Sequence, residues 1–431
     1  MGTGKTPATL NALNDLQLLD SRPALVIAPL RVAATTWPDE ARKWSHLAHM
    51  QVLPIIGSER TRLAALRQDA HLYTSNFEQL PWLVQQYEKR PWPFRTVVVD
   101  ESTKLKGFRL RQGTQRAKAL ARVAHTQCER LVELTGTPSP NGLADLWGQV
   151  WFLDKGARLG RTYDDFRKRW FEKSYDGFSI EARPHAQEQI QRALADLCIT
   201  IDAKDWFDLR EPIVNNIYVE LPAKARALYE DMEKRMFMEL AGHEVEAFGA
   251  AARTVKCLQI ANGAAYVGES NKEWAEVHDI KLQALEEVVE EAGGMPVLVA
   301  YQFKSDLARL QKAFGDSAIT LNTTEGLRRA QRGEGKVWLG HPASMGHGVD
   351  GLQQHSNIMA FFGHDWNLEN RLQIIERIGP TRQMQAGMDR PMFIHNIIAR
   401  GTVDELVLKR VETKRETQDI LLEAMKIKGY R

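Results

Sequence analysis

Val97-Val98-Val99-Asp100-Glu101-Ser102-Thr103-Lys104 is the stretch of sequence that decides the fold. Three β-branched apolar residues in a row predict a fully buried parallel strand. Two carboxylates follow where this strand ends, and ligands of open α/β sheets gather at the carboxyl ends of strands. The stretch therefore indicates a Walker B element, in which Asp100 holds Mg²⁺ and Glu101 orients and deprotonates the attacking water. A strand that simply ends in acidic residues at a sheet edge is the alternative.

The chain opens with Met1-Gly2-Thr3-Gly4-Lys5-Thr6, which ends like the P-loop pattern Gly-x-x-x-x-Gly-Lys-Thr. Backbone N–H groups of such a loop close on phosphate, the lysine reaches the β/γ-phosphates, and the threonine hydroxyl ligates Mg²⁺. We therefore predict ATP and Mg²⁺ as cofactors, with Thr6 and Asp100 as the magnesium ligands. The predicted nucleotide contacts here are Gly2, Thr3, Gly4, Lys5 and Thr6.

This P-loop pattern is incomplete, because its first glycine and the strand that normally delivers the loop would precede Met1. We expect either that the sequence begins late or that nucleotide binding is impaired. A Gly-Lys-Thr at a terminus is also compatible with a flexible tail.

The composition limits the class of protein. A length of 431 residues suggests two or three domains, and 43% hydrophobic residues supply an ordinary globular core. A net charge of +2 leaves a nucleic-acid partner undecided, so any basic surface must be local. Cys128, Cys198 and Cys257 lie far apart and predict neither a disulfide framework nor a metal site. With no apolar run of bilayer length and no signal peptide, we expect a cytoplasmic protein with no membrane partner.

Strands alternate with helices in two parts of the chain, at 24–138 and again at 296–398. This alternation predicts an α/β fold with parallel sheets. We expect a first lobe at 1–153, a largely helical insertion at 154–292, and a second lobe at 293–431 that ends in a helix. Within the insertion, the basic segment 161–173 is either a face for DNA phosphates or, as we favour, an amphipathic helix. Several predicted strands of the first lobe end in side chains that suit contacts with phosphate or backbone: Arg31, Thr74, Ser75, Thr135 and Thr137. The alternative is that the hydroxyl groups among them only cap helices.

In their order and spacing these segments resemble the Swi/Snf family of double-stranded DNA translocases, in helicase superfamily 2. The resemblance covers nearly the whole chain. Leu134-Thr135-Gly136-Thr137-Pro138, followed by Asn141 and Trp147, is the most specific match and resembles motif III. The other matches are Gly4-Lys5-Thr6 for motif I, Ile27–Trp44 for Ia, Thr74-Ser75 for Ib, Asp100–Lys106 for II, Val297–Phe303 for IV, Ser344–Leu352 for V and Gln373–Gln383 for VI.

This resemblance implies two RecA-like lobes with ATP in the cleft between them. It implies that Arg377 of motif VI meets the charge that develops on the γ-phosphate, and that Gly348 and Asp350 of motif V contact the nucleotide. It further implies a monomer that moves along duplex DNA by phosphate contacts, with little sequence preference. The residues that would couple the nucleotide to DNA are Arg31, Thr74, Ser75, Thr135, Thr137 and Gln373.

The sequence departs from the family pattern in two further places. Thr103 stands where motif II has histidine, which affects coupling between hydrolysis and DNA. In motif VI, Pro380 occupies the place of the second arginine and Arg382 the place of the glycine. A proline there could redirect the backbone so that Arg382 serves as the catalytic arginine.

We therefore expect an ATP-dependent translocase on double-stranded DNA, of phage or bacterial origin, acting in replication, recombination or repair. A DNA-binding scaffold with impaired ATPase activity and a strand-separating superfamily 2 helicase are the alternatives.

Overall fold

The computed structural model describes residues 3–173, 180–201, 209–242, 247–267, 273–345 and 349–426. The chain divides into two compact units, residues 2–202 with 414–431 and residues 203–413. The predicted site residues Gly2 and Gly348 lie outside the described residues.

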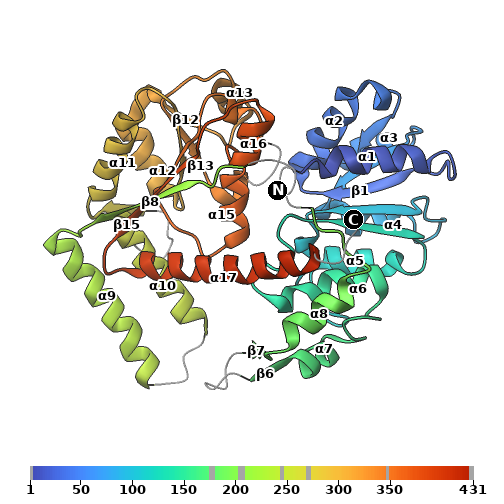
Figure 1. Ribbon diagram of the computed structural model, residues 1–431, viewed down its shortest axis with the longest axis horizontal. Helices are drawn as coiled ribbons and strands as arrows, with labels where there is room; N and C mark the ends of the chain where they lie inside the picture. The colour runs from blue at the N-terminus through green and yellow to red at the C-terminus, as the bar shows by residue number, and fades with distance from the viewer. Residues whose placement is uncertain are drawn as a thin grey trace. The chain divides into compact units, whose positions relative to one another are not determined.

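The first unit is built on a five-stranded parallel sheet with the strand order β2-β3-β1-β4-β5 (Figure 1). The two faces of β1 bury alternate side chains, because successive residues of a strand point to opposite faces. Leu25 and Ile27 pack toward α4 and α5, whereas Val26 and Ala28 pack toward α1 and α2. The strands are β1 (Ala24–Ala28), β2 (Val52–Pro54), β3 (Leu72–Asn76), β4 (Thr96–Asp100) and β5 (Arg130–Leu134).

Helices cover both faces of this sheet, and a small antiparallel hairpin follows it in the chain. The helices are α1 (Lys5–Leu16), α2 (Trp37–Lys43), α3 (Glu59–Leu66), α4 (Leu80–Gln86), α5 (Gln115–Ala124), α6 (Leu146–Asp154), α7 (Tyr163–Trp170) and α8 (Ala186–Leu194), and the hairpin is β6 (Phe171–Lys173) with β7 (Ile180–Ala182).

Most of the basic segment 161–173 forms helix α7, which begins at a capping box between Thr162 and Asp165, and its last three residues form β6. Phe166 and Trp170 are fully buried in the core of the first unit. The favoured interpretation, an amphipathic helix with an apolar side against the core, is therefore confirmed.

The second unit is built on a six-stranded parallel sheet with the order β12-β13-β11-β14-β15-β8. Side chains of α11 and α12 pack on one face of the sheet, and side chains of α13 and α15 on the other. The strands are β8 (Ile213–Val219), β11 (Val297–Ala300), β12 (Ala318–Thr320), β13 (Val337–Gly340), β14 (Ile358–Phe361) and β15 (Phe393–Ala399).

A separate apolar cluster joins α9, α10 and the start of α17. The helices of this unit are α9 (Ala223–Gly242), α10 (Ala247–Asn262), α11 (Ile280–Glu291), α12 (Lys304–Phe314), α13 (Thr324–Gln331), α14 (Pro342–Met345), α15 (Leu368–Ile375), α16 (Pro380–Gln385) and α17 (Val403–Lys426), with a hairpin of β9 (Ala264–Val267) and β10 (Glu273–Glu276).

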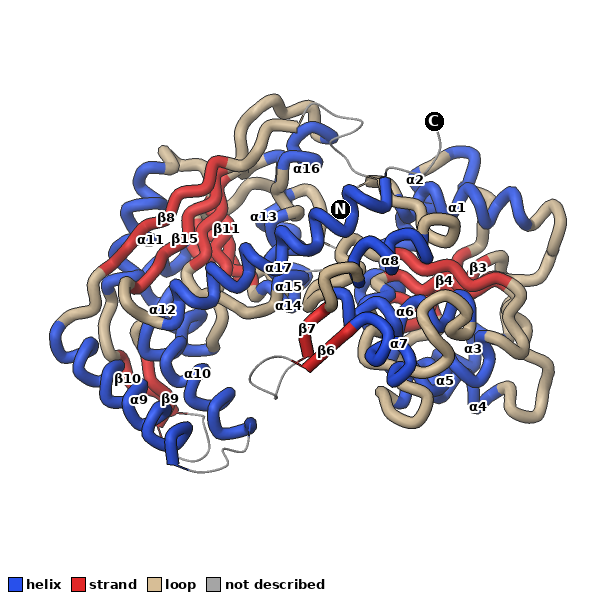
Figure 2. Tube along the Cα trace, turned by 60° about the horizontal axis from the view of Figure 1, so that its bottom comes forward, coloured by secondary structure: helices blue, strands red, loops and turns tan. Residues whose placement is uncertain are grey.

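Two parallel α/β sheets confirm the predicted fold class, but the segment 154–292 does not form a unit of its own among the described residues. Helices α7 and α8 pack with the first unit, and β8 is the edge strand of the second sheet. Figure 2 shows β8 beside β15, with which it pairs in parallel over its whole length. The predicted helical insertion is therefore divided between the two units.

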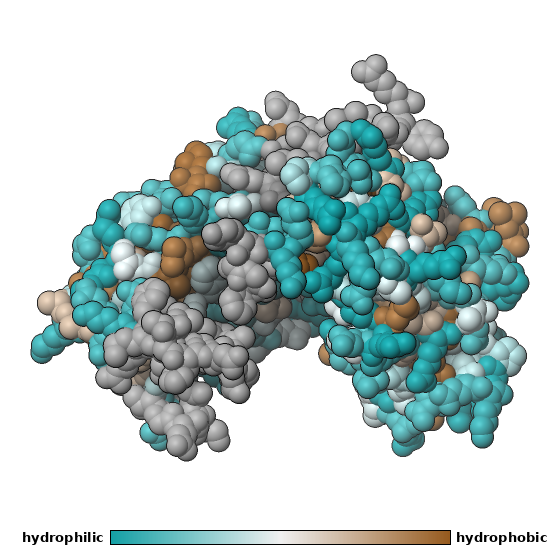
Figure 3. Space-filling model, turned by 90° about the horizontal axis from the view of Figure 1, so that it is seen from below, coloured by the Kyte–Doolittle hydropathy of each residue, from teal (hydrophilic) through white to brown (hydrophobic). Residues whose placement is uncertain are grey.

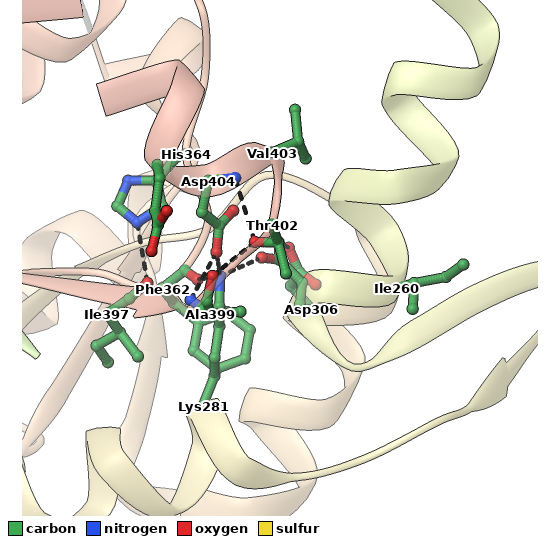
Figure 4. Close-up of polar contacts among 12 residues, drawn as sticks. Ile260, Lys281, Asp306, Phe362, His364, Ile397, Ala399, Thr402, Val403 and Asp404 are labelled. Carbon is green, nitrogen blue, oxygen red and sulfur yellow. Dashed lines mark hydrogen bonds and ion pairs between the residues drawn. The ribbon is translucent and has the colours of Figure 1, made fainter. Parts of the chain in front are cut away.

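A buried polar network crosses the second unit where several of its elements meet (Figure 4). The Lys281 ammonium lies 2.6 Å from the Asp404 carboxylate, and both side chains are fully buried. Lys281 also donates to the Asn262 side-chain oxygen at 2.8 Å, and the Asn262 amide donates to Asp306 at 3.0 Å. Because buried charges are costly unless they are paired, this network fixes the start of α17 against α10, α11 and α12.

The face of the molecule in Figure 3 is mostly hydrophilic, with hydrophobic residues scattered over it. Within the described ranges, no helix has the length and apolar character needed to cross a membrane.

Candidate active site

The carboxyl end of β4 brings the predicted magnesium ligand next to a tryptophan. Asp100 ends β4, and β1 pairs beside β4 in parallel register. The chain leaves β1 through a π-helical turn (Val32–Thr36) and enters α2 at Trp37, which is fully buried. The Trp37 Nε1–H donates to Asp100 Oδ2 at 3.0 Å. This bond links the segment after β1 to the end of β4, between residues that are 63 positions apart in the chain.

Helix α1 supplies the positive charge of this site. It begins at Lys5, and Gly4 precedes it in a left-handed conformation with φ 73° and ψ 24°, which favours glycine. Lys5 interacts electrostatically with Asp100. The first turn of a helix presents unpaired N–H groups and the positive end of its dipole, so this end of α1 suits a phosphate.

The electrostatics of Asp100 favour a cation beside it. Burial raises the pKa of Asp100, while the hydrogen bond from Trp37 and the charge of Lys5 act to lower it. Burial dominates, which means that the carboxylate charge is only partly compensated by the protein. Mg²⁺ is usually held by one or two carboxylates together with substrate phosphates, and Asp100 with the Thr6 hydroxyl fits this donor set. Among the residues that the structure describes, no group of three or more His, Cys, Asp or Glu side chains could hold a metal ion.

Glu101 lies directly after β4 in a left-handed conformation, with φ 62° and ψ 59°. This conformation is rare for a residue with a side chain and costs on the order of 1–3 kcal/mol, and such residues cluster at active sites. The backbone of Glu101 is therefore of the kind that is found at active sites.

A glutamine connects the segment after β4 to the segment after β5. The Ser102 hydroxyl donates to the Gln149 side-chain oxygen at 2.9 Å, and the Gln149 amide donates to the Pro138 carbonyl at 2.7 Å. Thr137 beside Pro138 is fully buried, and its backbone N–H donates to the Thr135 hydroxyl at 3.0 Å. The predicted coupling residues Thr135 and Thr137 therefore belong to a segment that is tied to the residues after β4.

The hydroxyls of Thr74 and Ser75 do not reach the surface. Both side chains are fully buried at the end of β3, where Thr74 donates to the Ala33 carbonyl at 2.6 Å and Ser75 to the Ile55 carbonyl at 3.3 Å. They therefore make backbone contacts, which hold the chain after β1 and β2. Their role in coupling the nucleotide to DNA stays a prediction. Arg31 is half-buried beside this segment, and burial lowers the pKa of its guanidinium.

Arg377 and Gln373 are both engaged within the second unit. Arg377 lies in the turn after α15, and its guanidinium donates to the carbonyls of Gln373 and Val349, each at 3.0 Å. The Gln373 side chain is buried and lies 3.4 Å from Glu369. The Gln373 amide therefore faces the interior of the second unit, and its role in coupling the nucleotide to DNA stays a prediction.

The segment that resembles motif VI is divided between two helices. Helix α15 ends at Ile375, and a new helix, α16, begins at Pro380 after Gly379. Arg382 lies in the first turns of α16 and forms an ion pair with Asp350 at 2.7 Å. Burial acts to raise the pKa of Asp350, but the Arg382 charge and the Gly351 N–H outweigh it and lower the pKa. Asp350 is therefore an ionised partner of Arg382 in this structure.

The first unit thus places Lys5 within electrostatic reach of Asp100, with Glu101 next to Asp100 in the chain. Sequence reasoning missed Trp37 and Gln149 as site residues. Trp37 lies in the stretch that resembles motif Ia, but a buried tryptophan is usually a core residue, and nothing local indicates that its N–H points at a carboxylate 63 residues away. Gln149 carried no signal in the sequence.

Two parallel α/β units with a Gly-Lys-Thr helix start and an Asp-Glu strand end define a helicase-like nucleoside triphosphatase. The family model described as SNF2-related domain matches residues 1–265. The chain belongs to this family of helicase-like ATPases.

Two relatives show how far the similarity extends. Protein p41 of Acyrthosiphon pisum secondary endosymbiont phage 1 is 54% identical over 99% of this chain and 94% of that protein, which supports a phage origin. Helicase ssl-1 of Caenorhabditis elegans is 27% identical over 54% of this chain, but the match spans only 10% of that much longer protein.

Among solved structures, the Sulfolobus solfataricus SWI2/SNF2 ATPase core in complex with dsDNA aligns over 99% of this chain and 88% of that chain. The sequence identity is 21%, and the TM-score is 0.42.

Proposed function

We propose that this protein hydrolyses ATP in response to duplex DNA and uses the energy to move along it. The observation that carries the proposal is the meeting of Lys5, at the start of α1, with Asp100, at the end of β4, in a chain of the SNF2-related family. A phosphate-binding helix end and a partly compensated carboxylate are what a magnesium–triphosphate complex requires.

The residues of the first unit have separate tasks in this proposal. The N–H groups at the start of α1 and the Lys5 ammonium bind the phosphates, while Asp100 and Thr6 would hold Mg²⁺. When bound, the metal neutralises charge on the phosphate oxygens. Glu101 would accept a hydrogen bond from the attacking water, orient it and take its proton.

Arg377 and Arg382 are the candidates for a positive charge on the transferred phosphoryl group. Such an arginine stabilises the charge that develops in the transition state. Arg382 would have to exchange its ion pair with Asp350 for the phosphate. Since Asp350 is the more exposed partner of that pair, water can replace Arg382 around it at modest cost.

The proposed partner is the phosphate backbone of double-stranded DNA, with little preference for sequence. Support comes from the family and from the helicases among its relatives. A role in the replication, recombination or repair of phage DNA is part of this proposal.

The test is the rate of ATP hydrolysis with and without linear duplex DNA, for the wild type, Lys5→Ala and Lys43→Ala. Lys43 is an exposed lysine of α2 and controls for the loss of one positive charge. We expect duplex DNA to stimulate the wild type and Lys43→Ala, and Lys5→Ala to be inactive. Duplex binding that is weakened by salt but unaffected by nucleotide would instead indicate the DNA-binding scaffold.

A further inference from the structure

Trp37 occupies a position that core packing alone does not explain. Its side chain is fully buried, and its one polar atom points at a carboxylate rather than at a backbone carbonyl. The π-helical turn before it sets the direction of the ring, and the Thr74 hydroxyl holds this turn by its bond to the Ala33 carbonyl at 2.6 Å. π-helical turns occur frequently at functional sites.

We propose that Trp37 is a positioning residue that holds the Asp100 carboxylate in the orientation needed to bind the metal of the magnesium–nucleotide complex. The inference rests on the proposed function of this site. An indole N–H is a donor only, so it cannot ligate a cation, and it stays neutral at every pH of interest. An ionised carboxylate offers about four lone-pair sites, and the bond from Trp37 occupies one of them at Oδ2. The remaining sites can meet a cation or its water ligands.

The physical reason lies in the freedom of a carboxylate. An aspartate at the end of a strand turns about its side-chain bonds, and a ligand that must first be oriented binds its metal more weakly. A neighbour that hydrogen-bonds a ligating carboxylate fixes its orientation, and loss of such a neighbour typically weakens metal binding by about 10–100-fold. Lys5 cannot take over this task, because its ammonium is a point charge on a flexible stem.

The competing explanation is that the Trp37 N–H only needs a partner because it is buried. This explanation predicts a loss of stability without a specific loss of metal affinity. Trp147 provides the matched control: it is equally buried in the same unit, and its Nε1–H donates at 2.9 Å to the Gly160 carbonyl, away from Asp100.

The experiment measures the binding of Mn²⁺, as a spectroscopic substitute for Mg²⁺, in the presence of a non-hydrolysable ATP analogue. The free ion is followed by electron paramagnetic resonance for the wild type, Trp37→Phe and Trp147→Phe, after circular dichroism has shown that each is folded. We expect the Mn²⁺ dissociation constant to rise about tenfold in Trp37→Phe and to stay near wild type in Trp147→Phe. If Trp37→Phe does not fold, replacement of Trp37 by benzothienylalanine removes the N–H alone and should give the same rise.

Equal Mn²⁺ affinity in the wild type and a folded Trp37 variant would overturn the inference while leaving the proposed function intact. If the wild type binds no Mn²⁺ with the nucleotide, the proposed function fails and the inference fails with it.

Discussion

Replacing Lys281 with methionine removes the ammonium that lies 2.6 Å from Asp404 in the second unit. Methionine keeps most of the volume of the side chain, so the change acts mainly on charge. The Asp404 carboxylate would remain buried with the Ala399 N–H at 3.0 Å as a hydrogen-bond donor and no ammonium beside it. Breaking a buried ion pair in this way costs about 3–5 kcal/mol. This is a large part of the roughly 5–15 kcal/mol that stabilises a domain.

The assay is urea unfolding followed by circular dichroism and tryptophan fluorescence. With a slope of about 2–3 kcal/mol per molar urea, Lys281→Met should lower the unfolding midpoint of the second unit by roughly 1–2 M. The double variant Lys281→Met/Asp404→Asn should recover part of this loss, because no unpaired charge then remains buried. Lys312→Met is the control, since Lys312 is exposed and lies 3.7 Å from Glu276 in the same unit. The reasoning is refuted if Lys281→Met unfolds at the same urea concentration as Lys312→Met.

Three further predictions concern catalysis and pH. Glu101→Gln should slow ATP turnover by about 10²–10⁴-fold and leave nucleotide binding intact, which filter binding would check; unchanged turnover would remove Glu101 from the mechanism. Arg382→Ala should lower turnover by about 10³-fold or more if Arg382 serves the phosphoryl group, whereas Arg400→Ala, at an exposed arginine, should not. Burial lowers the pKa of His364 to about 3, so its contribution to stability is full above pH 6.5 and is lost as the pH falls toward 3. Burial raises the pKa of Asp306 to about 6, so protonation of Asp306 stabilises the folded state as the pH falls from 6 to 3.8. His364→Gln removes the destabilising group and keeps Asp306, so the loss of thermal stability in acid should be smaller in this variant than in the wild type.

The parts of the fold that the sequence predicted well are those with a local signal. The buried run Val97–Val99 and the carboxylates after it mark β4 without any knowledge of its neighbours. Helix α12 (Lys304–Phe314) lies in the second part of the chain where strands and helices were predicted to alternate, and its apolar residues recur with helical spacing. The break in motif VI was likewise visible in Pro380, which cannot donate the hydrogen bond that a continuing helix needs.

The parts that the sequence did not predict depend on contacts between distant segments. Strand β8 lies in the segment that was expected to be largely helical. Its partner β15 lies about 180 residues further along the chain, so its membership in the second sheet was hidden. The three-residue strands β2 and β12 are too short to show a period. The buried hydroxyl of Thr74 and the bond from Trp37 to Asp100 also depend on where β1, β3 and β4 meet.

The most direct test of the central claim is the ATP turnover number of the wild type and of Lys5→Ala, each measured with and without blunt-ended duplex DNA. A turnover that rises on addition of the duplex and disappears in Lys5→Ala is the predicted result. A turnover that is the same with and without DNA, or that survives in Lys5→Ala, would contradict the account.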